Sequence, residues 1–446
     1  MWKYGIFMVV LIIFSVEFPA FAGNFVTSSN YHFQINNKDF FPIGWYDVDH
    51  SNFEIVKARG VNTILTYQSG ITNHKNSLNV YSSKLKLFLD AAWSEDLYVI
   101  TDIANLTVTE VSRVVLDDSI RTHPAMFAWY LADEPELHVR LKDSLLNTPD
   151  YLKRKYDTIR GIEYQFGDTR HPVIPVFSNP YFLKYLNICC PPCDKSIDKN
   201  CSYPPYYYPE SYDALMADSY MFGMDPLPIH SDFNNVSRTI TSRAMKQIEI
   251  SGKEGFIFVA QGNDSPRFKK RKLSYKEIVY QSLSPIIHGA RGLIYWSWAY
   301  CSPELKKEIN NFIYFFTQFQ LGDVVMQPLL EGMLSVIVYV DGKREDEYIW
   351  KKYNNGWVDK TTANFQLYNY ILTSYDGEYY LFSVNDFRKD ITVDFKLNNF
   401  VSVSLIENIM DHSNREIEFG RDHENDTWHF QDEVPGYAVK IYRIKP

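Results

Sequence analysis

Eight short apolar runs alternate with segments of helical pattern between residues 41 and 319, and this alternation constrains the fold more than any other feature. The runs are apolar throughout, as parallel strands buried on both faces are. Strands and helices in this order predict a (β/α)8 TIM barrel. We expect strands at Phe41–Tyr46, Val61–Tyr67, Leu97–Ile103, Phe127–Leu131, Pro172–Phe177, Ala214–Tyr220, Gly255–Gln261 and Gly292–Trp298. Helices are expected at Asn52–Arg59, Lys84–Ser94, Val108–Ile120, Tyr151–Tyr164, Arg238–Ile250, Tyr275–Ile287 and Pro303–Phe319.

The main structural rival is a doubly wound open sheet, which favours a glycine-rich phosphate turn after its first strand. The sequence has no such turn. After about residue 325 the pattern changes to short strands separated by turn residues. This change predicts a small antiparallel β-sandwich after the barrel. We therefore expect a barrel over about 30–325 and a sandwich over about 326–446, with strands near Ser335–Tyr339, Tyr379–Val384, Ile391–Phe395, Val401–Leu405 and Ala438–Tyr442.

The N-terminus has the pattern of a secretory signal peptide. Lys3 is followed by an apolar run, Phe7–Phe14, and Ala20-Phe21-Ala22 is a small-x-small cleavage signal. We expect residues 1–22 to be removed near Ala22 and the protein to be secreted or periplasmic. The alternative is an uncleaved membrane anchor, but the apolar run is short for a membrane span. We expect no membrane association after cleavage.

The cysteines fit export. Cys189, Cys190, Cys193 and Cys201 are clustered in a long excursion after the fifth strand, whereas Cys301 stands alone. Their spacing is not a standard zinc spacing, so two local disulfides are the favoured interpretation in an oxidising compartment. The sequence does not choose among the three possible pairings.

The composition favours a carbohydrate partner and argues against nucleic acid. The net charge is −9, and no basic run is long enough to follow a phosphate backbone. Aromatic residues make up 16% of the chain, with 33 Tyr and 9 Trp. Tyr and Trp provide flat, half-polar surfaces on which sugar rings stack. The sequence does not indicate the oligomeric state.

In a (β/α)8 barrel the functional residues lie at the carboxyl ends of the strands. No histidine–carboxylate cluster, nucleophile elbow or lysine is found there, so we predict no metal site and no cofactor. Carboxylates, amides and aromatic rings instead suit recognition of hydroxyl groups and hydrolysis of a glycosidic bond. The strand-end residues are Trp45, Tyr46, Asp47, Tyr67, Gln68, Asp102, Asp133, Glu134, Ser178, Asn179, Asp218, Tyr220, Gln261, Trp296 and Trp298.

The fourth strand runs into Asp133-Glu134-Pro135, and this motif resembles the large clan of (β/α)8-barrel glycoside hydrolases. In that clan the motif is typically Asn-Glu-Pro, and its Glu is the general acid/base. The resemblance implies that Glu134 is the acid and that Trp298, in Tyr-Trp-Ser-Trp, is the sugar platform at the end of strand eight. A small β-sandwich is a common companion of such barrels.

The sequence departs from the clan at two positions. Asp133 replaces the usual Asn, and strand seven ends in Gln261 where the clan has its nucleophilic Glu. An amide is a poor nucleophile, so the usual retaining mechanism does not transfer. Asp-Glu-Pro on strand four, Asp-x-Tyr on strand six (Asp218 to Tyr220) and Gln261 on strand seven together resemble a largely uncharacterised group of secreted glycosidase-like barrels.

Three arrangements remain open for the second catalytic group. Asp218 can act as base or nucleophile, and Asp102 or Asp133 can substitute for it. Alternatively, a substrate acetamido group is the nucleophile and Asp133 and Glu134 work as a pair.

The leading hypothesis is a secreted glycoside hydrolase acting on a poly- or oligosaccharide. Glu134, Asp218 and Asp133 are the candidate catalytic residues, and the sugar subsites are expected to contain Trp45, Asn179, Tyr220, Gln261 and Trp298. A non-catalytic carbohydrate-binding barrel that has lost its nucleophile is the first alternative. A polysaccharide lyase, with Tyr220 or a lysine as base, is the second.

Overall fold

The computed structural model describes most of the barrel and the sandwich. The signal segment, the cysteine cluster, the predicted helix at 238–250, Asn179 and Tyr220 lie outside the described residues. Described are residues 26–29, 32–67, 78–135, 145–167, 170–178, 209–218, 255–268, 271–345, 347–350, 353–354, 357–358, 363–366, 368–387, 389–410 and 415–446.

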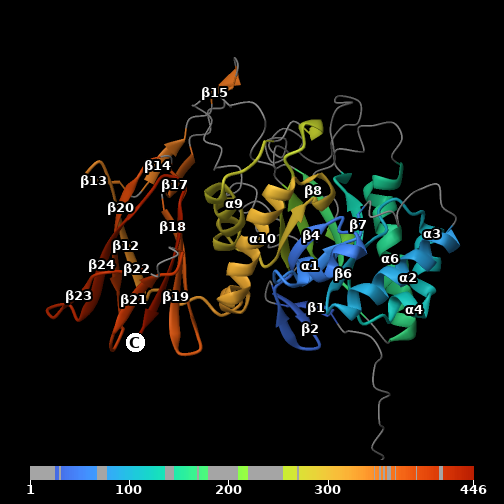
Figure 1. Cartoon of the computed structure of the whole chain (residues 1–446), viewed down its shortest axis with the longest axis horizontal. Helices are drawn as coiled ribbons and strands as arrows, with labels where there is room; N and C mark the ends of the chain where they lie inside the picture. Colours follow the sequence, from blue (N-terminus) through green and yellow to red (C-terminus); the bar gives the residue numbers. More distant parts are fainter. Residues whose placement is uncertain are drawn as a thin grey trace, which may run out of the picture.

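Eight parallel strands form a closed barrel, which confirms the predicted fold class (Figure 1). Each strand pairs with the next along the chain, and β11 closes the barrel on β4. The strands are β4 (Ile43–Tyr46), β5 (Thr63–Leu65), β6 (Tyr98–Asp102), β7 (Met126–Asp133), β8 (Val173–Ser178), β9 (Leu215–Asp218), β10 (Phe256–Gln261) and β11 (Leu293–Trp296).

Helices cover the outside of the barrel. The predicted helix at 108–120 is divided in two, because Asp117 has an extended backbone and its side chain accepts the N–H of Ser119 to begin a new helix. Capping boxes at Thr107/Glu110 and Ser274/Glu277 fix the starts of α3 and α9. The helices are α1 (Phe53–Lys57), α2 (Leu78–Ser94), α3 (Val108–Leu116), α4 (Asp118–Arg121), α6 (Pro149–Phe166), α9 (Tyr275–Ile287), α10 (Pro303–Gln318) and α11 (Leu321–Val325).

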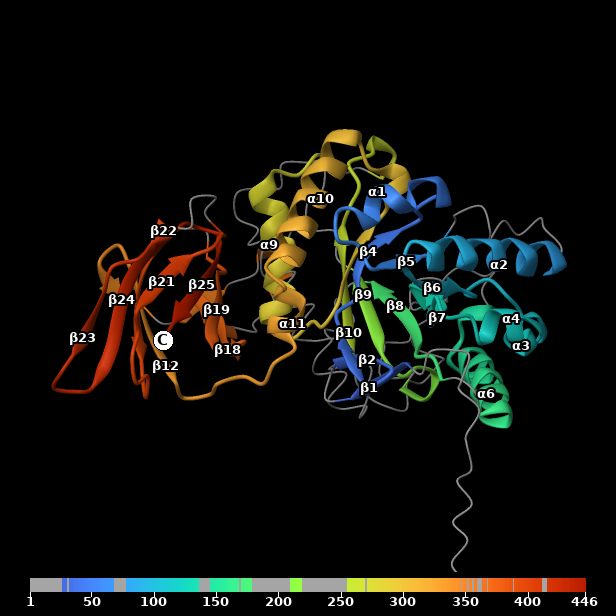
Figure 2. The ribbon, with the colours of Figure 1, turned by 60° about the horizontal axis from the view of Figure 1, so that its bottom comes forward.

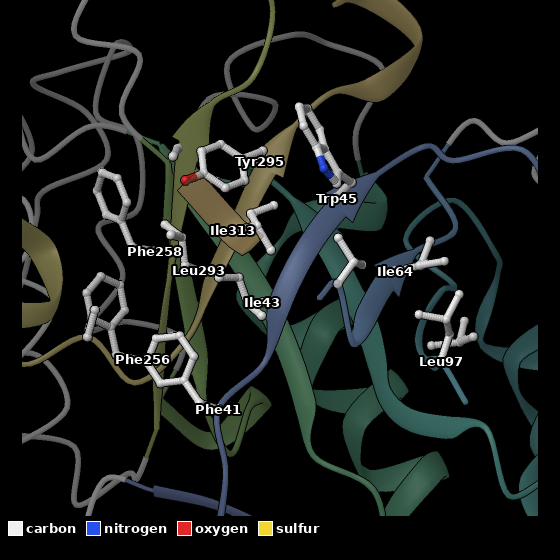
Figure 3. Packing of buried hydrophobic residues seen from close by; sticks show 14 of the residues in the cluster. Phe41, Ile43, Trp45, Ile64, Leu97, Phe256, Phe258, Leu293, Tyr295 and Ile313 are labelled. Atoms are coloured by element: carbon white, nitrogen blue, oxygen red, sulfur yellow. The ribbon is translucent and has the colours of Figure 1, made fainter. Parts of the chain in front are cut away.

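Where a barrel strand is regular, its successive residues face different cores. Tyr46 belongs to the inner cluster of buried side chains, whereas its neighbour Trp45 belongs to the outer cluster between strands and helices. Figure 3 shows the outer layer, with Trp45 of β4 near Tyr295 of β11 and Ile313 of α10. A side chain at a strand's carboxyl end is therefore placed inside or outside the barrel by its register.

A three-stranded antiparallel sheet closes the amino end of the barrel. It consists of β1 (Val26–Ser29), β2 (His32–Ile35) and β3 (Lys38–Phe40). Phe33 packs edge-on against Phe127 at the start of β7, with ring centroids 5.4 Å apart. The sequence pattern did not predict these strands, and they leave the carboxyl end as the mouth of the barrel.

The C-terminal part is a β-sandwich, as predicted, with two five-stranded antiparallel sheets around a second core. Figure 2 shows it beside α9 and α11, and the buried hydroxyl of Tyr280 on α9 donates to Asp386 Oδ1 at 2.7 Å. One sheet contains β12 (Leu334–Val340), β13 (Lys343–Arg344), β20 (Ile391–Leu397), β23 (Phe419–Asp422) and β24 (Thr427–Val434). The other contains β18 (Tyr368–Tyr375), β19 (Glu378–Asn385), β21 (Leu405–Asn408), β22 (Arg415–Glu416) and β25 (Val439–Lys445). Two hairpins pair β14 (Glu347–Trp350) with β17 (Ala363–Gln366) and β15 (Tyr353–Asn354) with β16 (Trp357–Val358).

Among the described residues, no helix has the length and apolar character needed to cross a membrane.

Candidate active site at the barrel mouth

A bulge near the end of β7 turns Asp133 into the barrel. Tyr130 pairs with Ile174 on β8, but Asp133 pairs with Val176, so β7 contains one residue more than β8 over this interval. Leu131 and the residue after it both pack in the outer core, and Asp133 then pairs with a residue of the inner core. Bulges of this kind often re-aim side chains beside active sites.

Glu134 follows the bulge with a left-handed backbone, at a φ of 42°. Its N–H donates to Val176 O at 3.0 Å, but β7 itself ends at Asp133, and Pro135 follows Glu134 directly. A left-handed non-glycine residue costs about 1 kcal/mol or more, and such residues concentrate at functional sites. The side chains of Asp133 and Glu134 are both half-buried at the mouth, which suits contact with a ligand.

Two tyrosine hydroxyls hold Asp133. Tyr130 Oη donates to Oδ1 at 2.6 Å, and Tyr67 Oη donates to Oδ2 at 2.8 Å. With Tyr46, the two rings form an edge-to-face cluster whose centroids are 5.9 to 6.3 Å apart. This cluster fixes the Asp133 carboxyl at the inner wall of the mouth.

Asp218 also faces the inside of the barrel. It ends β9, pairs with the inner residue Val259, and is buried. Burial raises the pKa of Tyr46 well above its usual value, and the charges of Asp133 and Asp218 raise it further. The charges of Asp133 and Asp218 therefore both affect the pKa of the Tyr46 hydroxyl, as expected for two carboxyl groups at one barrel mouth.

Two further carboxyl groups at the mouth are buried. Burial raises the pKa of Asp47, which follows β4, to about 7. Burial also raises the pKa of Asp102, at the end of β6, to about 7, where the N–H of Ala104 lowers it and the charge of Asp133 raises it. Sequence reasoning found these residues as strand ends but did not predict their altered titration, because burial depends on the folded mouth.

The side chain of Gln261 is directed into the loop that follows β10. Its Nε2 donates to Asn263 O at 3.1 Å and to Arg271 O at 3.5 Å, and the residue has no exposed surface. Gln281 also pairs with the backbone of Gln261. The Gln261 amide therefore holds the loop that follows β10, and Gln261 is not among the proposed sugar contacts.

The tryptophans differ from their predicted placement. Trp45 is fully buried, and its Nε1 donates to Asn310 on α10 at 3.2 Å.

Strand β11 ends at Trp296, so Trp298 is not its terminal residue. Trp298 lies in the short helix η6 (Trp298–Tyr300) and packs edge-on against Trp45. Trp296 pairs with Gln261, is half-buried, and lies 6.1 Å from Tyr300 between ring centroids. Trp296 is therefore the tryptophan at the mouth.

No group of three or more His, Cys, Asp or Glu that could hold a metal ion occurs in the part of the chain that the structure describes. The four clustered cysteines fall outside that part, so their disulfides stay a prediction. Cys301 is a free, buried thiol, and burial raises its pKa far above the usual value.

No known protein-family model matches the chain, and no curated protein matches it in sequence. Solved structures do match. A structure of Gan42B, a family 42 β-galactosidase from G. stearothermophilus, aligns with a TM-score of 0.53 at 8% identity, covering 95% of this chain and 100% of that one. A catalytic mutant of Gan42B aligns with a TM-score of 0.51 at 8% identity over the same shares of the two chains. At this identity the likeness shows the fold alone, a closed eight-stranded barrel followed by antiparallel sheets.

Proposed function

We propose that the protein is a secreted glycoside hydrolase that acts on a poly- or oligosaccharide, with Glu134 as the general acid. The observation that carries the proposal is the bulge in β7, which places Asp133 inside the barrel and half-buried Glu134 immediately after it. The fold shared with glycosidases supports this reaction class. The N-terminal pattern of Lys3, an apolar run and Ala20-Phe21-Ala22 supports export.

In the proposed reaction, Glu134 gives its proton to the glycosidic oxygen as the bond to the anomeric carbon breaks. Asp218 is the second group and activates a water molecule or attacks the anomeric carbon. Because β9 is two strands from β7 in the barrel, we expect a wide separation and inversion of configuration. Proton NMR of the first-formed product distinguishes the two routes: the inverted anomer supports Asp218 as the base that activates water, and the retained anomer contradicts the expected inversion and requires a nucleophile instead.

Trp296 replaces Trp298 as the proposed sugar platform, because its ring is half-buried at the mouth. Asn179 and Tyr220 remain proposed sugar contacts from the ends of the fifth and sixth strands. No cofactor is required by this reaction.

A non-catalytic carbohydrate-binding barrel is the second candidate, and Gln261 favours it. The clan's nucleophile position carries an amide here, and that amide is hydrogen-bonded to loop carbonyls. The two candidates differ in turnover. We expect the wild type to release reducing sugar from at least one member of a broad glycan panel, and Glu134→Gln to bind that glycan without releasing sugar. Binding without release by the wild type would establish the second candidate.

The matched control is Glu54→Gln, which makes the same change at an exposed position in the first turn of α1. It should leave both binding and release at wild-type levels.

A further inference from the structure

Asp102 is a buried carboxyl group inside the barrel mouth. It pairs across the sheet with Tyr130, a residue of the inner core, so the two side chains share the inner face. It is 2% exposed. Its Oδ1 accepts the N–H of Ala104 at 2.9 Å, while its Oδ2 has no hydrogen-bond partner among the described residues. A buried carboxyl oxygen without a partner is costly, so a ligand or a proton is expected there.

Three titratable groups face Asp102 from three elements. Asp133 faces it from β7, Lys155 from α6, and Tyr81 from α2, whose hydroxyl donates to the Asp102 carbonyl at 2.6 Å. The Lys155 ammonium donates to Ala104 O at 2.6 Å and, more weakly, to Ile103 O at 3.4 Å. No hydrogen bond joins Lys155 to the Asp102 carboxyl among these contacts.

Asp133 acts as a hydrogen-bond acceptor, because each of its carboxyl oxygens accepts a hydrogen bond from a tyrosine hydroxyl. The burial of Asp102 and the charge of Asp133 both favour the neutral form of the Asp102 carboxyl. A neutral carboxyl carries one O–H donor, which an ionised one lacks. The mouth thus presents a donor from β6 and an acceptor from the neighbouring strand β7.

We propose that Asp102 and Asp133 form a carboxyl pair that holds one proton, on Oδ2 of Asp102, and that this pair binds two neighbouring hydroxyl groups of a neutral sugar ring. Asp102 donates to one hydroxyl and Asp133 accepts from the other. The sugar half of this inference rests on the proposed carbohydrate function; the shared proton does not.

A purely structural role for Asp102 would be to close the turn at Ala104. That role uses Oδ1 alone, and Asp102→Asn preserves it with an amide oxygen. The same variant supplies an N–H donor in place of the O–H and removes the titration. A turn residue and a proton carrier therefore give different results with this variant.

Infrared difference spectra between about pH 5.5 and about pH 8.5 test the proton directly, because a protonated carboxyl has its own C=O band. We expect Asp102→Asn to remove one such band, and Asp133→Asn to move the same band to lower pH by removing the neighbouring charge. Asp47→Asn is the matched control: it removes a different buried carboxyl and should leave the Asp102 band in place. A band that survives Asp102→Asn, or that Asp133→Asn does not move, would overturn the shared proton.

Binding measured in the Glu134→Gln background, which prevents turnover, tests the ligand. The probes are an array of neutral oligosaccharides and an array of uronate oligosaccharides. We expect a neutral glycan to bind about tenfold more weakly at about pH 8.5 than at about pH 5.5, because one hydrogen bond is lost when Asp102 releases its proton. The Asp102→Asn variant should bind the same glycan with equal affinity at the two pH values. The proposed sugar contact would be overturned if the protein preferred uronates or bound no neutral glycan. It would also be overturned if Asp102→Asn lost affinity at alkaline pH as the protein with Asp102 does. Because neither test requires hydrolysis, a failure of the proposed function would be seen separately, as binding without product.

Discussion

Replacing Asp102 by Asn should make the protein more stable at neutral and alkaline pH. The pKa of this carboxyl is about 7 in the fold, against 3.8 for a free Asp side chain. The folded state therefore keeps a proton that the unfolded chain releases, and stability falls as pH rises from about 4 to about 7. The gap between the two values corresponds to a cost of about 4 kcal/mol above pH 7. Asn does not titrate, so the variant avoids this cost.

The gain should be smaller than that ceiling because of Lys155. Burial lowers the pKa of this ammonium group to about 8, and the charge of Asp102 supports the charged form. The variant removes that support. We therefore expect Asp102→Asn to be about 2 kcal/mol more stable than the wild type near pH 8 and to differ little near pH 4.

Urea unfolding followed by circular dichroism, repeated from about pH 4 to about pH 8.5, measures this difference. Asp376→Asn is a control with the same chemical change at an exposed hairpin turn of the sandwich, and it should follow the wild type at every pH. If the difference between Asp102→Asn and the wild type does not grow with pH, Asp102 is not a proton-holding group and the reasoning is refuted.

Two other substitutions test contacts that the sequence did not reveal. Gln261→Glu replaces a donor to the carbonyls of Asn263 and Arg271 by a buried carboxylate, so thermal unfolding should show a loss of about 2 kcal/mol or more, and sugar release should not increase. A gain in hydrolysis would show that Gln261 faces the substrate after all. Tyr280→Phe removes the hydroxyl that donates to Asp386 between barrel and sandwich, and should lower the free energy of unfolding by about 1 kcal/mol. An unchanged urea midpoint would mean that this bond contributes nothing net.

The barrel was predictable because its strands are continuous apolar runs, and period and order alone identify such a fold. The N-terminal sheet was missed because β2 and β3 are short, and their pairing depends on packing against Phe127 rather than on a local pattern. The helix break at Asp117 could have been predicted, because Asp is a favoured N-cap residue. The apolar pattern continues across this position, however, and it favoured one unbroken helix.

The sequence was sufficient to predict which strand ends contribute residues to the site. It was not sufficient to predict how their side chains are oriented. The bulge that aims Asp133 inward is invisible in the sequence, where Leu131 and Ala132 look like ordinary strand residues. Trp298 was chosen over Trp296 because the expected strand was two residues too long. The direction of Gln261 depends on loop carbonyls that become neighbours only after folding.

The leaving-group dependence of Glu134→Gln tests the central claim most directly. A general acid is needed for a sugar leaving group but not for dinitrophenolate, which departs without a proton. We predict that Glu134→Gln hydrolyses the natural oligosaccharide about 100-fold or more slowly than the wild type, while it hydrolyses the matching dinitrophenyl glycoside at nearly the wild-type rate. Equal losses on both substrates, or no loss on the oligosaccharide, would contradict the assignment of Glu134 as the acid.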